Sequence, residues 1–201
     1  MDIDLKPSIY LASQSPRRAE LLDQIGVCFE VLSVETDESA QPGESIEEHV
    51  RRLALKKARA GWAISRQKSG LPVLGADTIV VRDGRFLGKP LDRDQAIQML
   101  QLLSAGWHQV MSAVALVNGD AEEVSLSTSR VQFATLDGAW CASYWATGEP
   151  ADKAGAYAIQ GIAASKIRSL DGSYSGVMGL PLYETSLLLR QFGVAILGAS
   201  L

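Results

Sequence analysis

The chain has 201 residues, of which 47% are hydrophobic and 21% charged, and this is enough apolar material for a full core. Its formal net charge of −4 argues against broad nucleic-acid binding, because proteins that contact many phosphates usually carry excess basic charge. No apolar run approaches the length of a membrane span, and the start MDIDLKPSIY lacks both the basic and the apolar region of a signal peptide. We therefore expect a globular protein that stays in the cytoplasm, with neither membrane nor nucleic acid as a partner.

Hydrophobic periodicity predicts helices and strands that interleave along the whole chain. Strands are expected at Ile9–Ala12, Val73–Val81, Val110–Val117 and Val124–Phe133. Helices are expected at Pro16–Ile25, Ile46–Ile64, Arg93–Leu103, Ala139–Ala146 and Leu182–Phe192. Asp83-Gly84 and Asn118-Gly119 are signals for two-residue hairpins, so some neighbouring strands must be antiparallel. The sequence therefore predicts an α/β (α+β) fold in which a mixed, twisted central sheet is flanked by helices.

No internal repeat, low-complexity segment or long linker divides the chain. We expect a single domain over residues 1–201, either undivided or bilobed with a central cleft. Cys28 and Cys141 lie in apolar surroundings without the spacing of a zinc site, which indicates reduced, packed thiols. With only His49 and His108 available, the composition gives little support to a zinc site built on several histidines.

The first predicted helix begins with two cations. Ser15 and Pro16 indicate its cap and first residue, and Arg17 and Arg18 then occupy the first turn. The helix dipole disfavours a cation there by about 0.3–1 kcal/mol. A polyphosphate at this end would meet backbone amides, the favourable end of the dipole and two guanidinium groups. The pattern therefore favours an anionic ligand.

A lysine interrupts the apolar stripe of the second predicted helix. The capping box Ser45 and Glu48 opens this helix, and Lys57 then falls near the middle of the stripe, whereas Lys56 falls well off it. Lys57 either buries its stem and keeps its ammonium in water, or lines a cleft with that ammonium.

A carboxylate interrupts an apolar strand in the segment PVLGADTIVV, where Asp77 is followed by Thr78. An unpaired buried carboxylate would cost several kcal/mol, so Asp77 must meet a cation, a metal, hydrogen-bond donors or a water-filled cleft. A purely structural ion pair remains the alternative. A two-residue turn at Asp83-Gly84 would pair Arg82 with Arg85 and Val80 with Leu87, and would bring Lys89 back beside Asp77.

The acidic loop VETDESAQPGES precedes the second helix and contains Glu35, Asp37 and Glu38. Such residues are usually only solvated. Magnesium prefers a few carboxylates together with substrate phosphate oxygens. One acid of this loop and Asp77 would suit that ion.

Taken together, these segments resemble the Maf family of nucleoside triphosphate pyrophosphatases, which is historically associated with septum formation. The resemblance spans nearly the whole chain, and the AYAIQG segment is similar to the family branch that hydrolyses dTTP and UTP. The segments that carry it are, in order, SQSPRR, DES followed by RLALKKA, GADTIV, GKP, KAGAYAIQG and GSYSGVMGLPL. Ser112 after HQVM, where the family commonly has Thr, and an extra residue in SAGWH depart from the family pattern near His108.

The resemblance implies roles for particular side chains. Asp77 would be the proton acceptor and, with Glu38, would hold a divalent Mg²⁺ or Mn²⁺. The cationic positions around the triphosphate would be Arg17, Arg18, Lys57 and Lys89. The positions implied for substrate binding are Ser13, Arg17, Thr78 and Gln160. The family also implies a homodimer.

The chemistry that the resemblance implies is attack of water on the α-phosphorus, which releases a nucleoside monophosphate and pyrophosphate. Gln160 offers both a donor and an acceptor, which suits the O4 and N3–H edge of uracil or thymine; alternatively, it only bonds backbone in its Gly-flanked loop. Two other functions stay open: a nucleotide-binding regulator of division with weak or no hydrolysis, and a house-cleaning pyrophosphatase for modified pyrimidine nucleotides.

Overall fold

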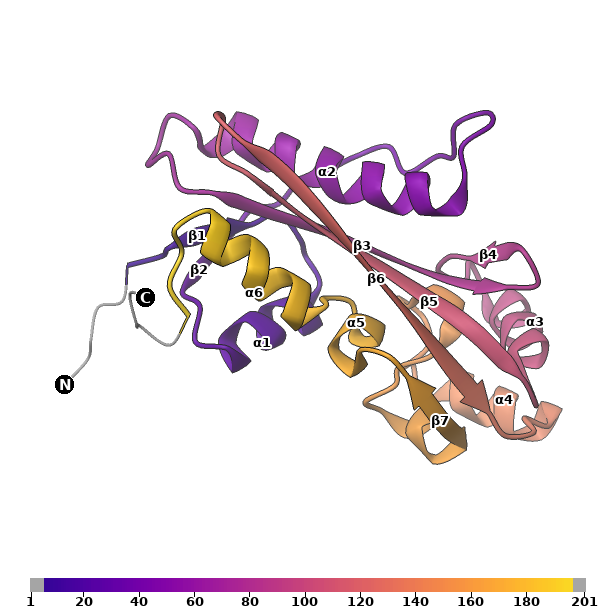
Figure 1. Ribbon diagram of the computed structural model, residues 1–201. Coiled ribbons are helices and arrows are strands. Elements are labelled where there is room, and N and C mark those ends of the chain that lie inside the picture. Colours follow the sequence, from indigo (N-terminus) through magenta and orange to yellow (C-terminus); the bar gives the residue numbers. More distant parts are fainter. Residues whose placement is uncertain (1–5, 197–201) are drawn as a thin grey trace. The chain divides into compact units, whose positions relative to one another are not determined.

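The computed structural model describes residues 6–196, and its helices and strands interleave along the chain (Figure 1). The strands are β1 (Ile9–Leu11), β2 (Phe29–Val31), β3 (Val73–Arg82), β4 (Arg85–Leu87), β5 (Trp107–Val117), β6 (Glu122–Phe133) and β7 (Ile167–Asp171). The α-helices are α1 (Pro16–Gln24), α2 (Ile46–Ser65), α3 (Arg93–Leu103), α4 (Gly138–Ala146), α5 (Tyr174–Met178) and α6 (Leu182–Gln191). Two short 3₁₀ helices are η1 (Ala154–Ala156) and η2 (Ile162–Lys166). Within residues 6–196, no helix combines the length and the apolar character needed to cross a membrane.

The strands form one mixed sheet in the order β2-β1-β3-β5-β6-β7, with β4 paired to β3. β1 runs parallel to both β2 and β3, because α1 and α2 supply the crossover connections that parallel neighbours need. β4 is antiparallel to β3, and β7 is antiparallel to β6. The predicted mixed sheet with helices is confirmed.

The described chain falls into two compact units. The first contains residues 6–77, 112–127 and 179–196, and the second contains residues 78–111 and 128–178. In the first unit, a small apolar cluster of Tyr10, Ala12, Leu32 and Val73 fixes β1 against β3. In the second, α3 packs against α4 and η1 over a core that includes Leu100, Phe133, Tyr144 and Tyr157. The expectation of a single domain over the whole chain stays a prediction.

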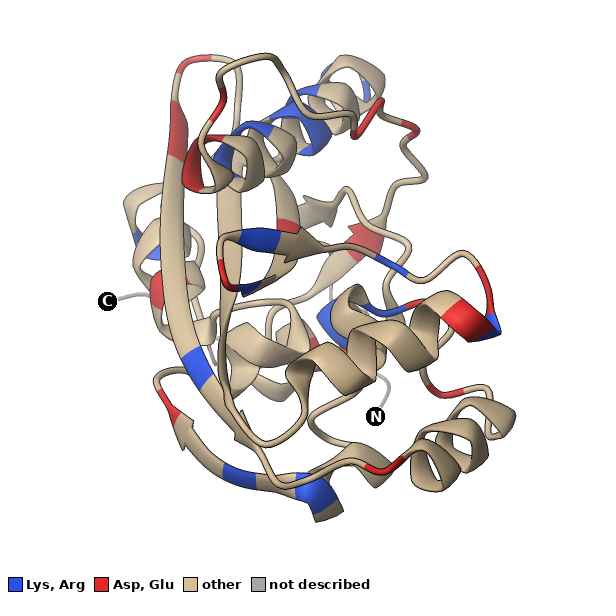
Figure 2. Ribbon diagram, turned by 90° about the vertical axis from the view of Figure 1, so that its right-hand side faces the viewer, with Lys and Arg blue, Asp and Glu red and all other residues tan. Residues whose placement is uncertain are grey.

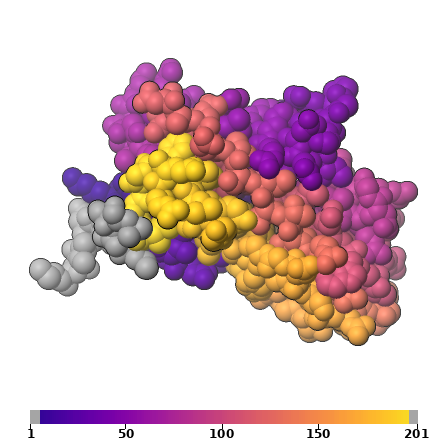
Figure 3. Space-filling model, viewed as in Figure 1, coloured from indigo at the N-terminus to yellow at the C-terminus, as the bar shows by residue number. Residues whose placement is uncertain are grey.

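The N- and C-terminal thirds of the chain meet within the first unit. The Arg18 guanidinium on α1 donates from Nε to the carbonyl of Gly179, just before α6, at 2.9 Å. α6 forms part of the surface in the space-filling view (Figure 3), and this bond ties the start of α1 to the segment just before α6. This contact fixes the first turn of α1.

The two predicted hairpins have different outcomes. Asp83 and Gly84 both have positive φ, at 51° and 73°, as a type I′ turn requires, and the predicted pairs Arg82↔Arg85 and Val80↔Leu87 are confirmed. The second turn is shifted by one residue from its prediction. The Asn118 N–H bonds the Ala121 carbonyl at 3.2 Å, so the two central residues are Gly119 and Asp120. Asn118 Oδ1 instead accepts from the backbone of Asp120 and Ala121.

The short elements were missed. β2 is three residues long, with one half-buried and two exposed side chains, so it carries no period-2 pattern. β7 and α5 have five residues each, too few for a periodicity to register. Cys28 and Cys141 are free thiols, as predicted.

Candidate functional site

Three predicted residues of the first unit meet at one point. Lys57 Nζ lies 2.7 Å from Asp77 Oδ1 and 2.6 Å from Glu38 Oε1. The side chains of Lys57 and Asp77 are each 13% exposed, whereas that of Glu38 is 51% exposed. Lys57 therefore does not place its ammonium in open water. It pairs with both acids, and the three side chains form what we call the Lys57 cluster.

Close packing of α2 on β3 explains why Lys57 and Asp77 meet. A Cβ added at Gly75 would clash with the backbone of Ala54 and Ala58 on α2, so only glycine allows this approach. Asp77 lies two residues further along β3 and therefore faces the same side of the strand. Lys57 lies next to Ala58 on α2, so the close approach of β3 places the Asp77 carboxylate beside the Lys57 ammonium.

Two basic residues of α2 hold the acidic loop in place. Lys56 donates from Nζ to the Asp37 carbonyl at 2.8 Å, and Arg52 donates from Nη2 to the Ser39 carbonyl at 3.0 Å. These carbonyls flank Glu38, so the two contacts set its backbone beside Lys57. The Ser39 N–H bonds Asp37 Oδ1 and lowers the pKa of the Asp37 carboxyl. The sequence patterns did not indicate these roles of Arg52 and Lys56.

The first turn of α2 carries acids, as the helix dipole favours. Glu47 and Glu48 occupy this turn, and the basic residues, blue in the ribbon of Figure 2, follow further along the helix. The predicted capping box is confirmed, because Ser45 Oγ accepts from the Glu48 N–H and the Glu48 side chain accepts from the Ser45 N–H. The capping box thus satisfies the backbone N–H groups at the start of α2, the helix that carries Lys57.

Arg18 is tied to the protein at the start of α1. Its Nη1 donates to Ser13 Oγ at 3.1 Å, in addition to the bond from Nε to Gly179. Burial lowers the pKa of Arg18, the nearby charges of Asp77 and Glu38 raise it, and Arg17 lowers it. The two arginines and the Lys57 cluster therefore share one electrostatic neighbourhood in the first unit.

Ser13 takes a role at the start of α1 that the sequence predicted for Ser15. Ser15 is the N-cap residue, but its side chain makes no capping bond. Ser13 is 8% exposed, and its hydroxyl accepts from the Ser15 N–H at 3.2 Å. Ser13 therefore orders the turn in which Arg17 and Arg18 begin the helix.

The remaining predicted residues belong to the second unit. Thr78 directly follows Asp77 in β3 and is half-buried. Lys89 is exposed and follows β4, in a segment where the Gly88 carbonyl accepts from the Gly155 N–H at 3.0 Å. Gln160 is exposed and lies in the turn closed by the bond from the Gly161 N–H to the Ala158 carbonyl. That these side chains meet the Lys57 cluster around one triphosphate stays a prediction.

The Lys57 cluster offers two carboxylates to a divalent cation. Carboxylate oxygens of Asp77 and Glu38 both lie within bonding distance of the single Nζ atom of Lys57, so the two acids converge on one cationic centre. Among residues 6–196, no three His, Cys, Asp or Glu side chains group as metal ligands. Mg²⁺ commonly takes one or two carboxylates and draws its other ligands from substrate phosphates and water. Asp77 and Glu38 therefore fit a Mg²⁺ ion that is shared with the substrate phosphates, and not one bound by protein ligands alone.

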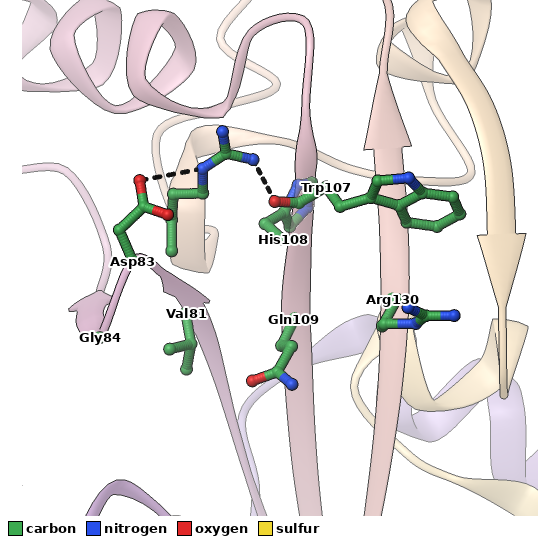
Figure 4. A pocket seen from close by; sticks show the side chains of 8 residues that line it. Val81, Asp83, Gly84, Trp107, His108, Gln109 and Arg130 are labelled. Carbon is green, nitrogen blue, oxygen red and sulfur yellow. Dashed lines mark hydrogen bonds and ion pairs between the residues drawn. The ribbon is translucent and has the colours of Figure 1, made fainter.

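A separate pocket of the second unit contains none of the predicted site residues (Figure 4). Its lining residues are Val81, Arg82, Asp83, Gly84, Trp107, His108, Gln109 and Arg130. The Arg82 guanidinium bonds Asp83 and the Trp107 carbonyl, and Arg130 lies over the Trp107 ring at 5.2 Å. Because none of the residues predicted for the phosphates lines it, this pocket is not the anion site that the sequence predicts.

His108 beside this pocket is structural and sensitive to acid. It is 3% exposed, bonds Tyr157 Oη through Nε2 at 2.8 Å and stacks on Phe133. Burial, and secondly the charge of Arg82, lower the pKa of His108 to about 3. The unfolded chain then binds the proton more readily, so stability is present above the ordinary histidine pKa and is lost as the pH falls from about 6.5 towards 3.

The variant His108→Phe tests this linkage. Between about pH 7 and about pH 5, His108 alone is expected to remove about 2 kcal/mol from the free energy of unfolding of the wild type. Urea unfolding at both pH values measures that loss. In the variant, whose ring cannot be protonated, the loss between the two pH values should be smaller by this amount. An equal loss in both proteins would show that His108 does not carry the acid sensitivity.

Comparison with known proteins identifies the family of this chain. A family model described as "Maf-like protein" matches residues 8–192. A protein named dTTP/UTP pyrophosphatase from Methylobacillus flagellatus is 52% identical over 198 residues, which cover 98% of each chain. A protein of the same name from Alkalilimnicola ehrlichii is 51% identical over 197 residues, which cover 96% of this chain and 97% of the relative.

Among solved structures the likeness is weaker. A nucleoside-triphosphatase / dITP/XTP pyrophosphatase from Mycobacterium abscessus covers 63% of this chain and 72% of its own, at 24% identity and a TM-score of 0.37. The family assignment therefore depends on the sequence match, which extends over nearly the entire length. The chain belongs to the Maf family.

Proposed function

We propose that this protein is a nucleoside triphosphate pyrophosphatase that hydrolyses dTTP and UTP to the monophosphate and pyrophosphate. The observation that carries the proposal is the Lys57 cluster, in which a largely buried acid on a strand meets a lysine and a loop acid. Relatives about half identical over nearly the whole chain bear the name of this activity. We further propose that the enzyme acts in the cytoplasm as a homodimer, as the family resemblance implies.

In the proposed reaction, water attacks the α-phosphorus. Asp77 accepts the proton of the attacking water, a bond forms between the water oxygen and the α-phosphorus, and the bond from the α-phosphorus to the bridging oxygen breaks. The electron pair leaves with pyrophosphate. Lys57, which is 2.7 Å from Asp77, holds this carboxylate in a fixed orientation. The general-base contribution of such a group is about 10²–10⁴-fold.

The cations supply the larger part of the catalysis. Arg17 and Arg18 at the start of α1, together with Lys57 and Lys89, stabilise the negative charge that develops on the leaving pyrophosphate. Arg18 is fixed in place by Ser13 and Gly179, so its orientation is set before substrate binds. Ser13, besides holding Arg18, contributes its hydroxyl to the phosphate subsite.

A divalent cation belongs to this proposal. Asp77 and Glu38 would hold Mg²⁺ or Mn²⁺, which when bound neutralises phosphate charge and lowers the pKa of water. The substrate phosphates would complete the ligand set. Glu38 is half-exposed and is therefore accessible to an ion that arrives with the nucleotide.

Base selectivity is assigned to Gln160 and Thr78. The Gln160 amide presents one donor and one acceptor, which match O4 and N3–H of uracil or thymine. Cytosine presents the reverse pattern, an acceptor at N3 and a donor at N4, which pairs with the amide only if the amide turns over, and the purines carry their edge on a larger ring system. An amide held in one orientation at a subsite of pyrimidine size therefore favours uracil and thymine. Thr78, next to Asp77 in β3, is placed in the substrate subsite on the family resemblance.

A substrate panel with product analysis tests the proposal. With Mg²⁺ or Mn²⁺ present, the wild type should cleave dTTP and UTP at least about 10-fold better, by kcat/KM, than ATP, GTP, CTP or methylated GTP. Pyrophosphate and the monophosphate should appear together, and removal of the metal with EDTA should abolish turnover. Preference for a purine would refute the role of Gln160, and stepwise release of phosphate would refute attack at the α-phosphorus.

A further inference from the structure

The turn that carries Gln160 is held on both sides by two side chains outside it. The Ala158 N–H donates to the Tyr144 hydroxyl at 3.1 Å, and the Ile162 N–H donates to Glu149 Oε2 at 3.0 Å. Tyr144 in turn donates its hydroxyl proton to Glu149 Oε1 at 2.6 Å. The two anchored amides lie two residues before and two residues after Gln160. We call Tyr144 and Glu149 the turn clamp.

The clamp is itself rigid. Tyr144 is 2% exposed and stacks on Trp140, one turn earlier in α4. Burial raises the pKa of Tyr144, so its hydroxyl keeps its proton and donates to Glu149. Lys153 bonds the Glu149 carbonyl at 2.7 Å, and Thr147 Oγ1 accepts from the Glu149 N–H at 3.2 Å. Glu149 is thereby fixed through both its backbone and its carboxylate.

The turn packs directly against the clamp. A Cβ added at Gly161 would meet the Glu149 carboxylate, so a larger residue next to Gln160 would displace that carboxylate from the turn. Ala158 and Ile159 on the other side of Gln160 are each 5% exposed. Gln160 is thus the exposed residue of a turn whose neighbours are buried or clamped, which is the placement expected of a side chain that reads a ligand from a rigid base.

We propose that Tyr144 and Glu149 are positioning residues that set base selectivity by fixing the Gln160 turn. This inference rests on the proposed function, because it needs Gln160 to read the pyrimidine edge. Neither residue touches the substrate. Their hydrogen bonds hold the Gln160 backbone, so that the amide faces the base with little loss of conformational entropy on binding.

The test compares Tyr144→Phe and Glu149→Ala with wild type. Tyr144→Phe keeps the buried ring and removes only the hydroxyl that bridges Ala158 and Glu149. The expected result is a fall of about 10-fold or more in the ratio of kcat/KM for UTP to that for CTP. The fall should come from a higher KM for UTP at nearly unchanged kcat, since the clamp acts on binding and not on the reacting atoms.

Three controls separate positioning from a general loss of structure. Glu149→Gln keeps an oxygen for the Ile162 N–H and should restore most of the selectivity lost in Glu149→Ala. Tyr183→Phe removes a hydroxyl from a tyrosine that is 72% exposed and should change nothing. Hydrogen exchange of the amides of residues 158–162, measured without nucleotide, should be faster in Tyr144→Phe and Glu149→Ala than in wild type.

The outcomes are distinct. A wild type that does not prefer UTP over CTP would contradict the proposed function, and the inference would fall with it. A selective wild type whose selectivity and amide protection survive in Tyr144→Phe would overturn the clamp alone. If Tyr144→Phe does not fold, the Glu149→Ala and Glu149→Gln pair decides. Equal selectivity in those two variants would count against the inference, and rescue by Gln would support it.

Discussion

Replacing Lys57 with methionine is expected to lower both the free energy of unfolding and the rate of nucleotide hydrolysis. Methionine fills similar space but leaves the largely buried Asp77 carboxylate and Glu38 converging without their cation. Removing one partner of a fully buried ion pair costs about 3–5 kcal/mol. Because Glu38 is half-exposed and water can reach the cluster, we expect a smaller loss of about 1–3 kcal/mol.

The effect of Lys57→Met on catalysis should exceed its effect on stability. The ammonium orients Asp77 and, in the proposed mechanism, stabilises charge on the phosphates. Loss of one such preorganised charge typically lowers kcat by about 10²–10³-fold. The measurement is kcat and KM for dTTP at a temperature where circular dichroism shows the variant to be folded, together with its urea unfolding curve.

Arg59→Met is the matched control on the same helix. Arg59 pairs with Glu122 at 2.5 Å, but its side chain is 57% exposed, and exposed ion pairs contribute about 0–1 kcal/mol. This variant loses the same charge from α2 and should keep nearly wild-type turnover. If Lys57→Met and Arg59→Met behaved alike, the Lys57 cluster would have no special role in either stability or catalysis.

The long elements could be predicted from the sequence because their apolar periodicity is strong and their ends carry local signals. α3 was predicted with the bounds Arg93–Leu103 that the structure has. For α2 the capping box fixed the start. The first hairpin register followed from Asp83-Gly84, because two consecutive positive φ angles allow only one common turn type. Short strands such as β2 form because they pair with a neighbouring strand, and their own residues show no alternation of apolar and polar side chains.

The pairing of Lys57 with Asp77 was foreseeable because each residue alone broke an apolar pattern, and opposite charges in a core need each other. The contact between Arg18 and Gly179 could not be found in this way. It joins residues 161 positions apart. Every residue has a backbone carbonyl, so the sequence does not mark which one accepts the bond. The same holds for Lys56 and Arg52, whose acceptors are the carbonyls of Asp37 and Ser39.

The turn clamp in the second unit could not be predicted from the sequence either. Tyr144 lies on a helix whose side chains are mostly apolar, so the sequence indicates only core packing for it. Glu149 lies in a loop, where an acid is usually solvated. Only the folded chain shows that both side chains bond the backbone on either side of Gln160. Partners of backbone amides are set by tertiary structure, which explains why they escaped prediction.

Asp77→Asn is the second large expected effect. Asparagine keeps the size of the side chain and an oxygen for Lys57, but it cannot accept a proton from water. Turnover of dTTP should fall by about 10²–10⁴-fold, the usual contribution of a general base, while the nucleotide still binds. Unless a metal ion bridges them, a protein that only bound nucleotides would gain nothing from an acid near a triphosphate, because like charges repel. The variant therefore separates an enzyme from a binding protein.

Asp37→Asn provides the control for this substitution. Asp37 lies in the acidic loop, is exposed and accepts from the Ser39 N–H through Oδ1, a bond that asparagine can also make. Removing the negative charge of Asp37 should leave kcat for dTTP within about 2-fold of wild type. Together, the two variants distinguish the acid in the Lys57 cluster from an acid one residue away from Glu38.

The most direct test of the account is the turnover of Asp77→Asn measured beside its affinity for dTTP. Single-turnover hydrolysis gives the chemical rate, and isothermal titration calorimetry with Mg²⁺ gives the dissociation constant for the same protein. The account predicts a chemical rate lowered at least about 100-fold with a dissociation constant within about 10-fold of wild type. A chemical rate equal to that of wild type would contradict the central claim that the carboxylate held by Lys57 activates the attacking water.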